Sequence, residues 1–310
     1  MTACEPRVSI GMPVYNGGEL LREAADSLLA QEMGDLELIF SDNTSTDGTS
    51  ELCREYARRD PRVRYYRNDA NIGAFSNFER VVELARAPYF MWASHDDLWA
   101  PQFVSTCLAA MASPDVVLAY PKCLVIEPDG QPFRLIDHHQ LTSTLGVCSP
   151  VQRLRRVLKA PDFWVLFYGL MRTDVLRQVL PISRVHANDS VLVALMSLLG
   201  QFADVPEVLF KFRQKANSVA IHKRADFLGE AEKKASRNFR SFWPATRSIC
   251  SRSMGMPIAP VQKLGVCLSA FRWYLSRYTS RGRRRARQLL TYRKSHSVPV
   301  RQTVESDTGR

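Results

Sequence analysis

The sequence lacks the apolar runs that mark membrane-spanning and secreted proteins. Its longest apolar run, residues 191–199, is broken only by Ser197 and is about half the length needed to cross a bilayer. The first seven residues contain Glu5 and Pro6 and do not form the apolar core of a signal peptide. We therefore expect no membrane span and a cytoplasmic location.

Two kinds of short signature are also missing. The 310 residues include seven scattered cysteines, with no Cys-x-x-Cys pair and no Cys/His spacing typical of zinc, which disfavours disulfides and structural zinc. The first β-rich run, residues 8–14, is followed by neither Gly-x-Gly-x-x-Gly nor Gly-Lys-Ser/Thr. A dehydrogenase and a phosphate-loop ATPase are therefore disfavoured.

Acidic residues are nearly absent from the C-terminal end. Residues 260–310 hold 12 Lys+Arg and 2 Asp+Glu, whereas residues 1–259 hold 30 and 29, so the net charge of +11 lies almost wholly in this tail. An apolar stretch at 266–275 precedes an arginine cluster, which favours attachment to an anionic membrane surface. The alternative is a helix packed on the body with solvated arginines. Nucleic-acid binding is disfavoured because the arginines lack interleaved aromatic residues.

The first 110 residues, by contrast, show a regular alternation of strand and helix patterns. Four β-rich runs alternate with three segments of helical periodicity, at residues 8–14, 19–31, 36–40, 49–59, 63–66, 75–85 and 88–93. This alternation predicts an α/β fold, with a doubly wound, mostly parallel sheet that has helices on both faces. A helix is expected at 102–112 and a strand at 116–120, followed by a hairpin that turns at Asp129-Gly130. Because hairpin strands are antiparallel, the sheet need not stay parallel beyond this point.

A polar cluster follows each of the four predicted strands. In strand order the clusters contain Asn16, Asp42, Arg67 and the adjacent pair Asp96 and Asp97. Carboxyl ends of parallel strands share one edge of a sheet, where ligands bind. Any one cluster is also what a solvated loop would contain, but four in register favour a binding site.

The pair Asp96 and Asp97 suggests a cation. Adjacent carboxylates repel one another, and a cation or separate partners relieve that repulsion. Mg²⁺ and Mn²⁺ take carboxylate oxygens and share their remaining positions with phosphates and water. The alternative is that both residues cap the helix expected after Pro101.

Taken together, these segments resemble the inverting family-2 glycosyltransferases, which have a GT-A fold. Four motifs carry the resemblance: Val8-Ser9-Ile10-Gly11-Met12-Pro13-Val14-Tyr15-Asn16, Ser41-Asp42-Asn43-Thr44-Ser45-Thr46-Asp47-Gly48-Thr49, Arg67-Asn68-x-x-Asn71-x-Gly73 and Asp96-Asp97. Order and spacing match over about the first 110 residues, and a weaker resemblance extends to about Ser218.

The resemblance implies roles for particular residues. The nucleotide-sugar donor would be bound by Pro13, Tyr15, Asn16, Asp42, Arg67, Asn71 and Asp96. Within this set Asp42 would accept the ring N–H of the base, and Asp96 would face the ribose. Asp97 would hold a divalent metal, Mn²⁺ or Mg²⁺, that bridges to the diphosphate. His95 stands where commoner forms of the motif carry Asp, so the division of roles within the pair stays open.

The resemblance also implies that Asp189 is the general base, with capping of a helix beginning at Ser190 as the alternative interpretation. Arg213, Lys215 and His222 would lie near the diphosphate or be solvated, and His138-His139 reads as a loop. Processive synthesis is disfavoured, because Ser269 replaces the Gln of the Gln-x-x-Arg-Trp motif.

The predicted organisation is a catalytic domain at 1–222 and a helical, basic region at 223–310. Within the catalytic domain, residues 1–112 would bind the nucleotide sugar, and residues 113–222 would supply the acceptor side and the base. The expected activity is transfer of one sugar to a saccharide or lipid-linked saccharide, on the cytoplasmic side and in contact with the membrane periphery. The alternatives are a nucleotidyltransferase acting on a sugar phosphate and a non-catalytic basic adaptor.

Overall fold

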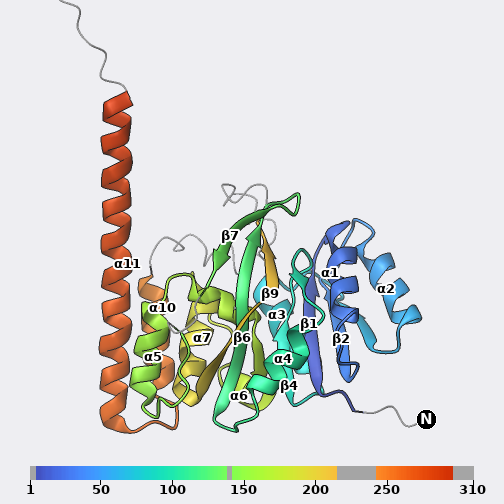
Figure 1. Ribbon diagram of the computed structural model, residues 1–310, viewed down its shortest axis with the longest axis horizontal. Coiled ribbons are helices and arrows are strands. Elements are labelled where there is room, and N and C mark those ends of the chain that lie inside the picture. Colours follow the sequence, from blue (N-terminus) through green and yellow to red (C-terminus); the bar gives the residue numbers. More distant parts are fainter. Residues whose placement is uncertain (1–4, 138–141, 215–241, 296–310) are drawn as a thin grey trace, which may run out of the picture.

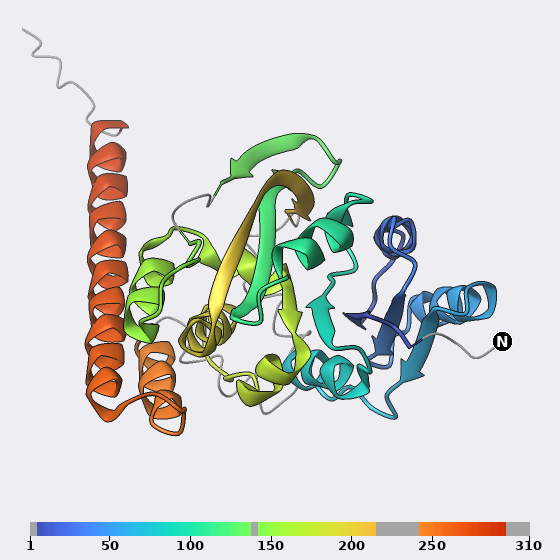
Figure 2. The same cartoon turned by 60° about the horizontal axis from the view of Figure 1, so that its bottom comes forward.

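The protein forms one mixed sheet with helices on both sides (Figures 1 and 2). The computed structural model describes residues 5–137, 142–214 and 242–295, of which 278–295 are described as helical backbone only. The strand order is β3-β2-β1-β4-β8-β6-β9-β5, with β7 beside β6. This arrangement confirms the predicted α/β fold.

The N-terminal half of the sheet is parallel. Its strands and helices are β1 (Val8–Val14), α1 (Leu20–Leu29), β2 (Leu36–Asp42), α2 (Thr49–Arg59), β3 (Val63–Arg67), α3 (Ala74–Leu84) and β4 (Tyr89–Trp92). Each matches its predicted segment within a few residues. The two central strands β1 and β2 are buried along their whole length, as expected for a parallel sheet covered on both faces.

The second half mixes strand directions. Its strands are β5 (Leu98–Trp99), β6 (Val116–Ile126), β7 (Pro132–Ile136), β8 (Leu170–Arg172) and β9 (Gln201–Arg213). Because β8 is antiparallel to both β4 and β6, those two strands run in the same direction, and β9 is parallel to β6. The carboxyl ends of β1, β2, β3, β4, β6 and β9 therefore share one edge of the sheet, called the carboxyl edge below.

The remaining helices lie around the second half of the sheet, and α10 and α11 form an outer layer on α5 and α7. They are α4 (Phe103–Ala110), α5 (Pro150–Lys159), the 3-10 helix η1 (Phe163–Tyr168), α6 (Thr173–Gln178), α7 (Asn188–Leu199), α10 (Trp243–Ser253) and α11 (Pro260–Ser295). None of the helices within the described ranges is both long and apolar enough to cross a bilayer. The boundary predicted at residue 222 falls outside the described residues.

An aromatic cluster joins the two halves beneath the carboxyl edge. Phe167 of η1 stacks on Trp92 of β4, with ring centroids 4.3 Å apart and planes 6° from parallel. Its neighbour Tyr168 lies 5.5 Å from Phe210 of β9. Buried aromatic pairs of this kind hold neighbouring elements in a fixed geometry. The cluster therefore fixes the end of β4 relative to the end of β9.

Candidate active site

The loops after β1 and β2 are joined by hydrogen bonds. Asn16, in a left-handed conformation at φ 52°, accepts the Thr46 N–H at its Oδ1 (2.9 Å) and donates its own N–H to Ser45 Oγ (3.0 Å). The Gly17 N–H donates to Thr49 Oγ1 at 2.8 Å. The two loops predicted to surround the nucleotide base therefore form one fixed unit.

Asp42, the last residue of β2, is fully buried and surrounded by donors. Its carboxylate accepts the Ser45 N–H (2.8 Å), the Tyr65 hydroxyl (2.9 Å) and the Ser50 hydroxyl, and it pairs with Arg67 Nη1 at 3.0 Å. Burial alone would raise the pKa of Asp42, but the hydrogen bonds from Ser50, Ser45 and Tyr65 outweigh it and lower the pKa. The group is therefore a carboxylate at neutral pH.

This environment bears on the role predicted for Asp42 at the base. Because the carboxylate has no exposed surface, an incoming ring N–H reaches it only when one of the present donors moves aside. The Arg67 side chain is the donor best placed to move, since it is 35% exposed. If a nucleotide displaced the Arg67 side chain, the ring N–H of the base would replace Arg67 as a hydrogen-bond donor to the Asp42 carboxylate.

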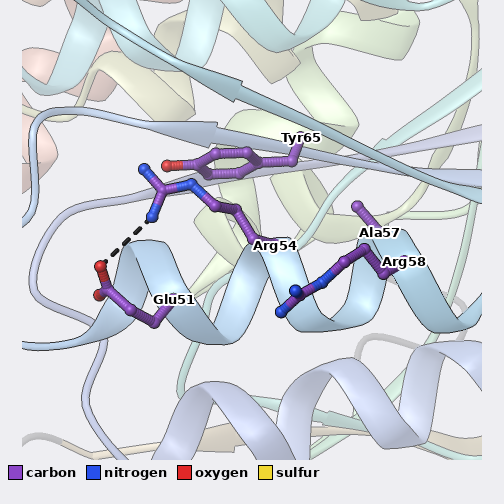
Figure 3. Close-up of a pocket in the computed structure, with 5 residues that line it drawn as sticks. All are labelled: Glu51, Arg54, Ala57, Arg58 and Tyr65. Atoms are coloured by element: carbon purple, nitrogen blue, oxygen red, sulfur yellow. Dashed lines mark hydrogen bonds and ion pairs between the residues drawn. The ribbon is translucent and has the colours of Figure 1, made fainter.

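A hollow of about 410 Å³ lies on the other side of Tyr65, between α2 and β3 (Figure 3). The guanidinium of Arg54 lies over the Tyr65 ring, 5.5 Å from its centroid, and pairs with Glu51 at 3.2 Å. Tyr65 thus has its ring at the hollow and its hydroxyl on Asp42. The predicted base site and this hollow share one side chain.

Asn71 shapes the loop between β3 and α3. Its Oδ1 accepts Asn43 Nδ2 (2.7 Å) and the Gly73 N–H (2.9 Å). Asn68 donates from Nδ2 to Asn43 Oδ1 at 3.0 Å and to Asn77 Oδ1 at 3.1 Å. Sequence reasoning did not single out Asn43 or Asn77. A polar residue on the buried side of the α3 pattern was the available signal for Asn77.

Asp96 and Asp97 lie between β4 and β5, at the carboxyl edge, and both are buried. The Asp96 carboxylate accepts the Ser94 hydroxyl, and Asp97 Oδ1 accepts the backbone N–H of Arg213 at 2.8 Å. The alternative that the pair caps the following helix is wrong. Helix α4 begins at Phe103 with Gln102 as its N-cap, because β5 intervenes between the pair and the helix.

Arg213, the last residue of β9, holds the aspartate turn in place. Its side chain donates to the Asp96 carbonyl from Nε (2.9 Å), to the Pro128 carbonyl from Nη1 (3.0 Å) and to Glu23 Oε2 from Nη2 (2.8 Å). With only 6% of its surface exposed, Arg213 is not solvated, so that alternative from the sequence is wrong. Its position beside the aspartate pair leaves the other alternative, a place near the diphosphate, as a prediction. Glu23 is a residue that the sequence interpretation missed.

The pair fits a hard divalent cation. Mg²⁺ and Mn²⁺ bind through one or two carboxylates and fill their remaining positions with phosphate oxygens and water. In the described ranges no cluster of three or more His, Cys, Asp or Glu side chains could hold a metal by itself. Two adjacent carboxylates therefore suit a cation that arrives with a diphosphate, and they do not suit a zinc cage.

Asp189 lies in the first turn of α7. The helix begins at Asn188 and its N-cap is Ala187, at φ 59°, so Asp189 is not the cap that the alternative interpretation assumed. Its Oδ1 accepts the Ser190 N–H at 2.6 Å. Carboxylates in a first helical turn are stabilised in their ionised form by the helix dipole. This is the form that a general base requires.

The segment before α7 is attached to the beginning of α3. The Ile182 N–H donates to Glu79 Oε1 at 2.7 Å, and Arg184 Nη2 donates to Ser76 Oγ at 3.1 Å. Helix α3 starts at the loop that follows β3, on the carboxyl edge. Arg184 therefore lies beside the first turn of α3, near the carboxyl edge, and Ile182 lies beside the middle of that helix.

The other predicted residues have definite positions or fall outside the described chain. Pro13 is buried in β1 opposite Ser41, and Tyr15 follows that strand half-buried. Lys215, His222 and the pair His138-His139 lie outside the described residues. The donor-site residues named from the sequence thus share the carboxyl edge, at the ends of β1, β2 and β3 or on the loops after β1, β3 and β4.

Part of the chain matches a known protein family. A family model described as "Glycosyl transferase family 2" matches residues 9–180, more than half of the chain. The chain belongs to glycosyltransferase family 2. The matched part of this family-2 glycosyltransferase contains Asp42, Asp96 and Asp97, whereas Asp189 lies beyond it.

Individual relatives are distant. The chain is 29% identical over 191 residues to the uncharacterised glycosyltransferase YibD of Escherichia coli K12. This alignment covers 60% of this chain and 54% of YibD. In general the chain spans about half or less of the length of the curated relatives it matches.

Solved structures share the fold. TarS 1–349 of S. aureus in complex with UDP-GlcNAc has a TM-score of 0.63 at 15% identity, over 87% of this chain and 73% of that one. The mannosyltransferase PcManGT of Pyrobaculum calidifontis, in complex with GDP-Man and Mn²⁺, has a TM-score of 0.53 at 18% identity, over 86% and 74%. The expected GT-A type of fold is thereby confirmed.

Proposed function

We propose that this family-2 glycosyltransferase moves a single sugar from a nucleotide-sugar donor to a saccharide or lipid-linked saccharide, with inversion at the anomeric carbon and with a divalent metal. The observation that carries the proposal is the placement of buried Asp42 and the Asp96–Asp97 pair on one carboxyl edge in a family-2 chain. Complexes of structural relatives with UDP-GlcNAc, and with GDP-Man and Mn²⁺, support the donor class and the metal.

The donor would bind across the carboxyl edge. The base would lie against Pro13, Tyr15 and Asp42, and its ring N–H would take a place on the Asp42 carboxylate. Asn16 and Asn71 would act by holding the surrounding loops, since their side-chain oxygens accept backbone N–H groups there. Preorganised loops reduce the ordering cost of binding the nucleotide.

The diphosphate would lie at the aspartate pair. Asp96 would face the ribose, and Asp97 would hold the metal, with Arg213 and Glu23 keeping the turn in position. The chemistry that a bound divalent cation supplies is positive charge beside the departing diphosphate.

Asp189 would act as the general base. Inversion requires the acceptor oxygen to attack the anomeric carbon from the face opposite the diphosphate, forming one C–O bond as the other breaks. Asp189 would take the proton from that acceptor hydroxyl. It lies in the first turn of α7, where the positive end of the helix dipole faces acidic side chains.

The test is a donor panel assayed with the full chain and Mn²⁺. Transfer should release a nucleoside diphosphate, and Asp97→Asn and Asp189→Asn should each lower the rate by about 100-fold or more. Asp189→Asn should bind the nucleotide as tightly as the parent does. Asp97→Asn should lose the part of the nucleotide affinity that depends on the metal. Asp174→Asn is the matched control, because Asp174 is exposed and lies on α6, outside the loops of the candidate site. Release of pyrophosphate would indicate a nucleotidyltransferase instead, and full activity of either site variant would refute that residue's role.

A further inference from the structure

The first half of α11 is apolar on two opposite faces. On the inner face Val266, Ala270 and Trp273 are buried, and the helix packs on α5 and α10. On the outer face four large apolar side chains are 45–78% exposed; these, called the outer stripe below, are Val261, Leu264, Leu268 and Phe271. A helix face directed to water normally carries charged residues, so an apolar outer face indicates a contact surface.

The outer stripe is continuous. Its members follow one another at intervals of three and four residues, which places them on one side of the helix. Leu268 and Phe271 also line a groove of about 340 Å³ between α10 and α11, together with Trp243, which is 49% exposed. The apolar surface therefore extends from α11 onto α10.

Charge indicates what covers this surface. Helix α11 contains ten Lys or Arg residues and no Asp or Glu, and eight of the ten lie between 277 and 295. Figure 1 shows that the basic half continues the same helix and projects past the body. A second copy docked parallel along the stripe would bring the two basic halves side by side, and their charges would repel. An antiparallel copy would cover the stripe but, since α11 contains no Asp or Glu, would not neutralise the basic halves with its own α11. An anionic lipid surface complements both the stripe and the charge.

We propose that the outer stripe and the basic half of α11 form one surface that binds anionic lipid bilayers, with the helix axis in the plane of the headgroups. The apolar side chains of the stripe enter the boundary between headgroups and acyl chains. The arginines of the basic half neutralise lipid phosphates. This inference rests on α11 alone and does not depend on the proposed sugar transfer.

Vesicle flotation of the full chain without donor tests the proposal. The protein should float with vesicles of phosphatidylcholine and phosphatidylglycerol, float little with phosphatidylcholine alone, and lose binding at high salt. The double variant Leu264→Ser, Leu268→Ser should lower partitioning by about tenfold. The control Phe133→Ser, Leu135→Ser changes two equally exposed apolar residues on β7 and should bind as the parent does.

Three outcomes would overturn the proposal. The first is no flotation with anionic vesicles, and the second is flotation of the stripe variant at the level of the control. The third is concentration-dependent dimerisation that the stripe variant abolishes while no protein binds vesicles, which would identify a second copy as the occupant. Circular dichroism checks that each variant is folded. Donor hydrolysis in solution should be unchanged in the stripe variant, so failure of membrane binding and failure of the proposed activity are distinguishable.

Discussion

Asp42 is a carboxylate without exposed surface, whose charge is stabilised by the hydrogen bonds around it. The pKa of Asp42 in the folded chain lies below its ordinary value of 3.8. By linkage, a depressed pKa contributes stability that is fully present above the unfolded pKa and is lost as pH falls through the folded pKa. Asp42→Asn should therefore destabilise the protein by about 2 kcal/mol at pH 7.

Urea unfolding of the parent and of Asp42→Asn between pH 7 and pH 2.5 measures this effect. The difference in unfolding free energy should be constant at neutral pH and should shrink below about pH 4. Exposed Asp69→Asn controls for the general effect of removing a carboxylate. A difference that is the same at every pH would contradict the role of ionised Asp42.

Arg213 is a positioning residue, because it acts through the aspartate turn. Residues that orient metal ligands typically contribute 10- to 100-fold to metal affinity or activity. Arg213→Lys should therefore raise the Mn²⁺ concentration needed for half-maximal transfer by about tenfold. The matched control is Arg172→Lys, since Arg172 also has three hydrogen-bond acceptors, the carbonyl groups of Val116, Met111 and Ser113. Equal metal requirements in both variants would show that Arg213 has only a general structural role.

At the residue scale, the sequence motifs predicted which residues lie at the carboxyl edge. They did not predict the contacts that hold those residues in position. Asn16, Asp42 and Asp97 lie at the end of a strand or within five residues after it, and the apolar pattern of each strand is local, so their shared edge follows from the fold class. The contact between Arg213 and Glu23 joins residues 190 positions apart. No local pattern predicts such a partner, because it exists only once β9 lies beside the β4–β5 turn.

At the scale of elements, α11 belongs partly to the folded body. Its inner face buries Val266 and Trp273 against α5 and α10, whereas the helix beyond residue 277 continues past the body (Figure 1). The sequence left two alternatives for this helix, packing on the body and attachment to a membrane. The structure shows that the inner face packs, so packing does not compete with a role for the outer face.

This division predicts different results for two truncations. A chain ending at residue 259 loses the buried contacts of Val266 and Trp273 and should be destabilised by about 3–5 kcal/mol. A chain ending at residue 277 keeps those contacts and should unfold within about 2 °C of the full chain. Thermal unfolding by circular dichroism measures both. Equal stability of the two truncated chains would show that α11 contributes little to the core.

The elements that the sequence predicted best are those with their own periodicity. Parallel strands β1 to β4 and helices α1 to α3 each carry a full apolar pattern. By contrast, β6 continues to Ile126 through Pro121 and Lys122, which interrupt the apolar run and coincide with register shifts against β9. The two-residue strand β5 exists through its pairing with β9, and local periodicity cannot indicate so short an element.

At the scale of the whole molecule, charge and chemistry occupy different regions. The carboxylates of the proposed site lie at the carboxyl edge of a nearly neutral body, and the excess positive charge lies in and beyond α11. Figure 1 shows α11 projecting past the body on the side where the β6–β7 turn lies, which is the side of the carboxyl edge. Under the proposed membrane contact the bilayer would lie along α11, at the end of the molecule opposite β2 and α2 (Figures 1 and 2).

The bonds between Arg213 and the Asp96–Asp97 turn also set an order of assembly during synthesis. The turn is complete only after a segment made more than 110 residues later has been added, since the two contacts span 116 and 117 positions. A nascent chain that has already folded β1 to β4 therefore still lacks the support of its aspartates. Donor binding would begin only when β9 has left the ribosome, so a prematurely ended chain would carry the family motifs without a functioning site.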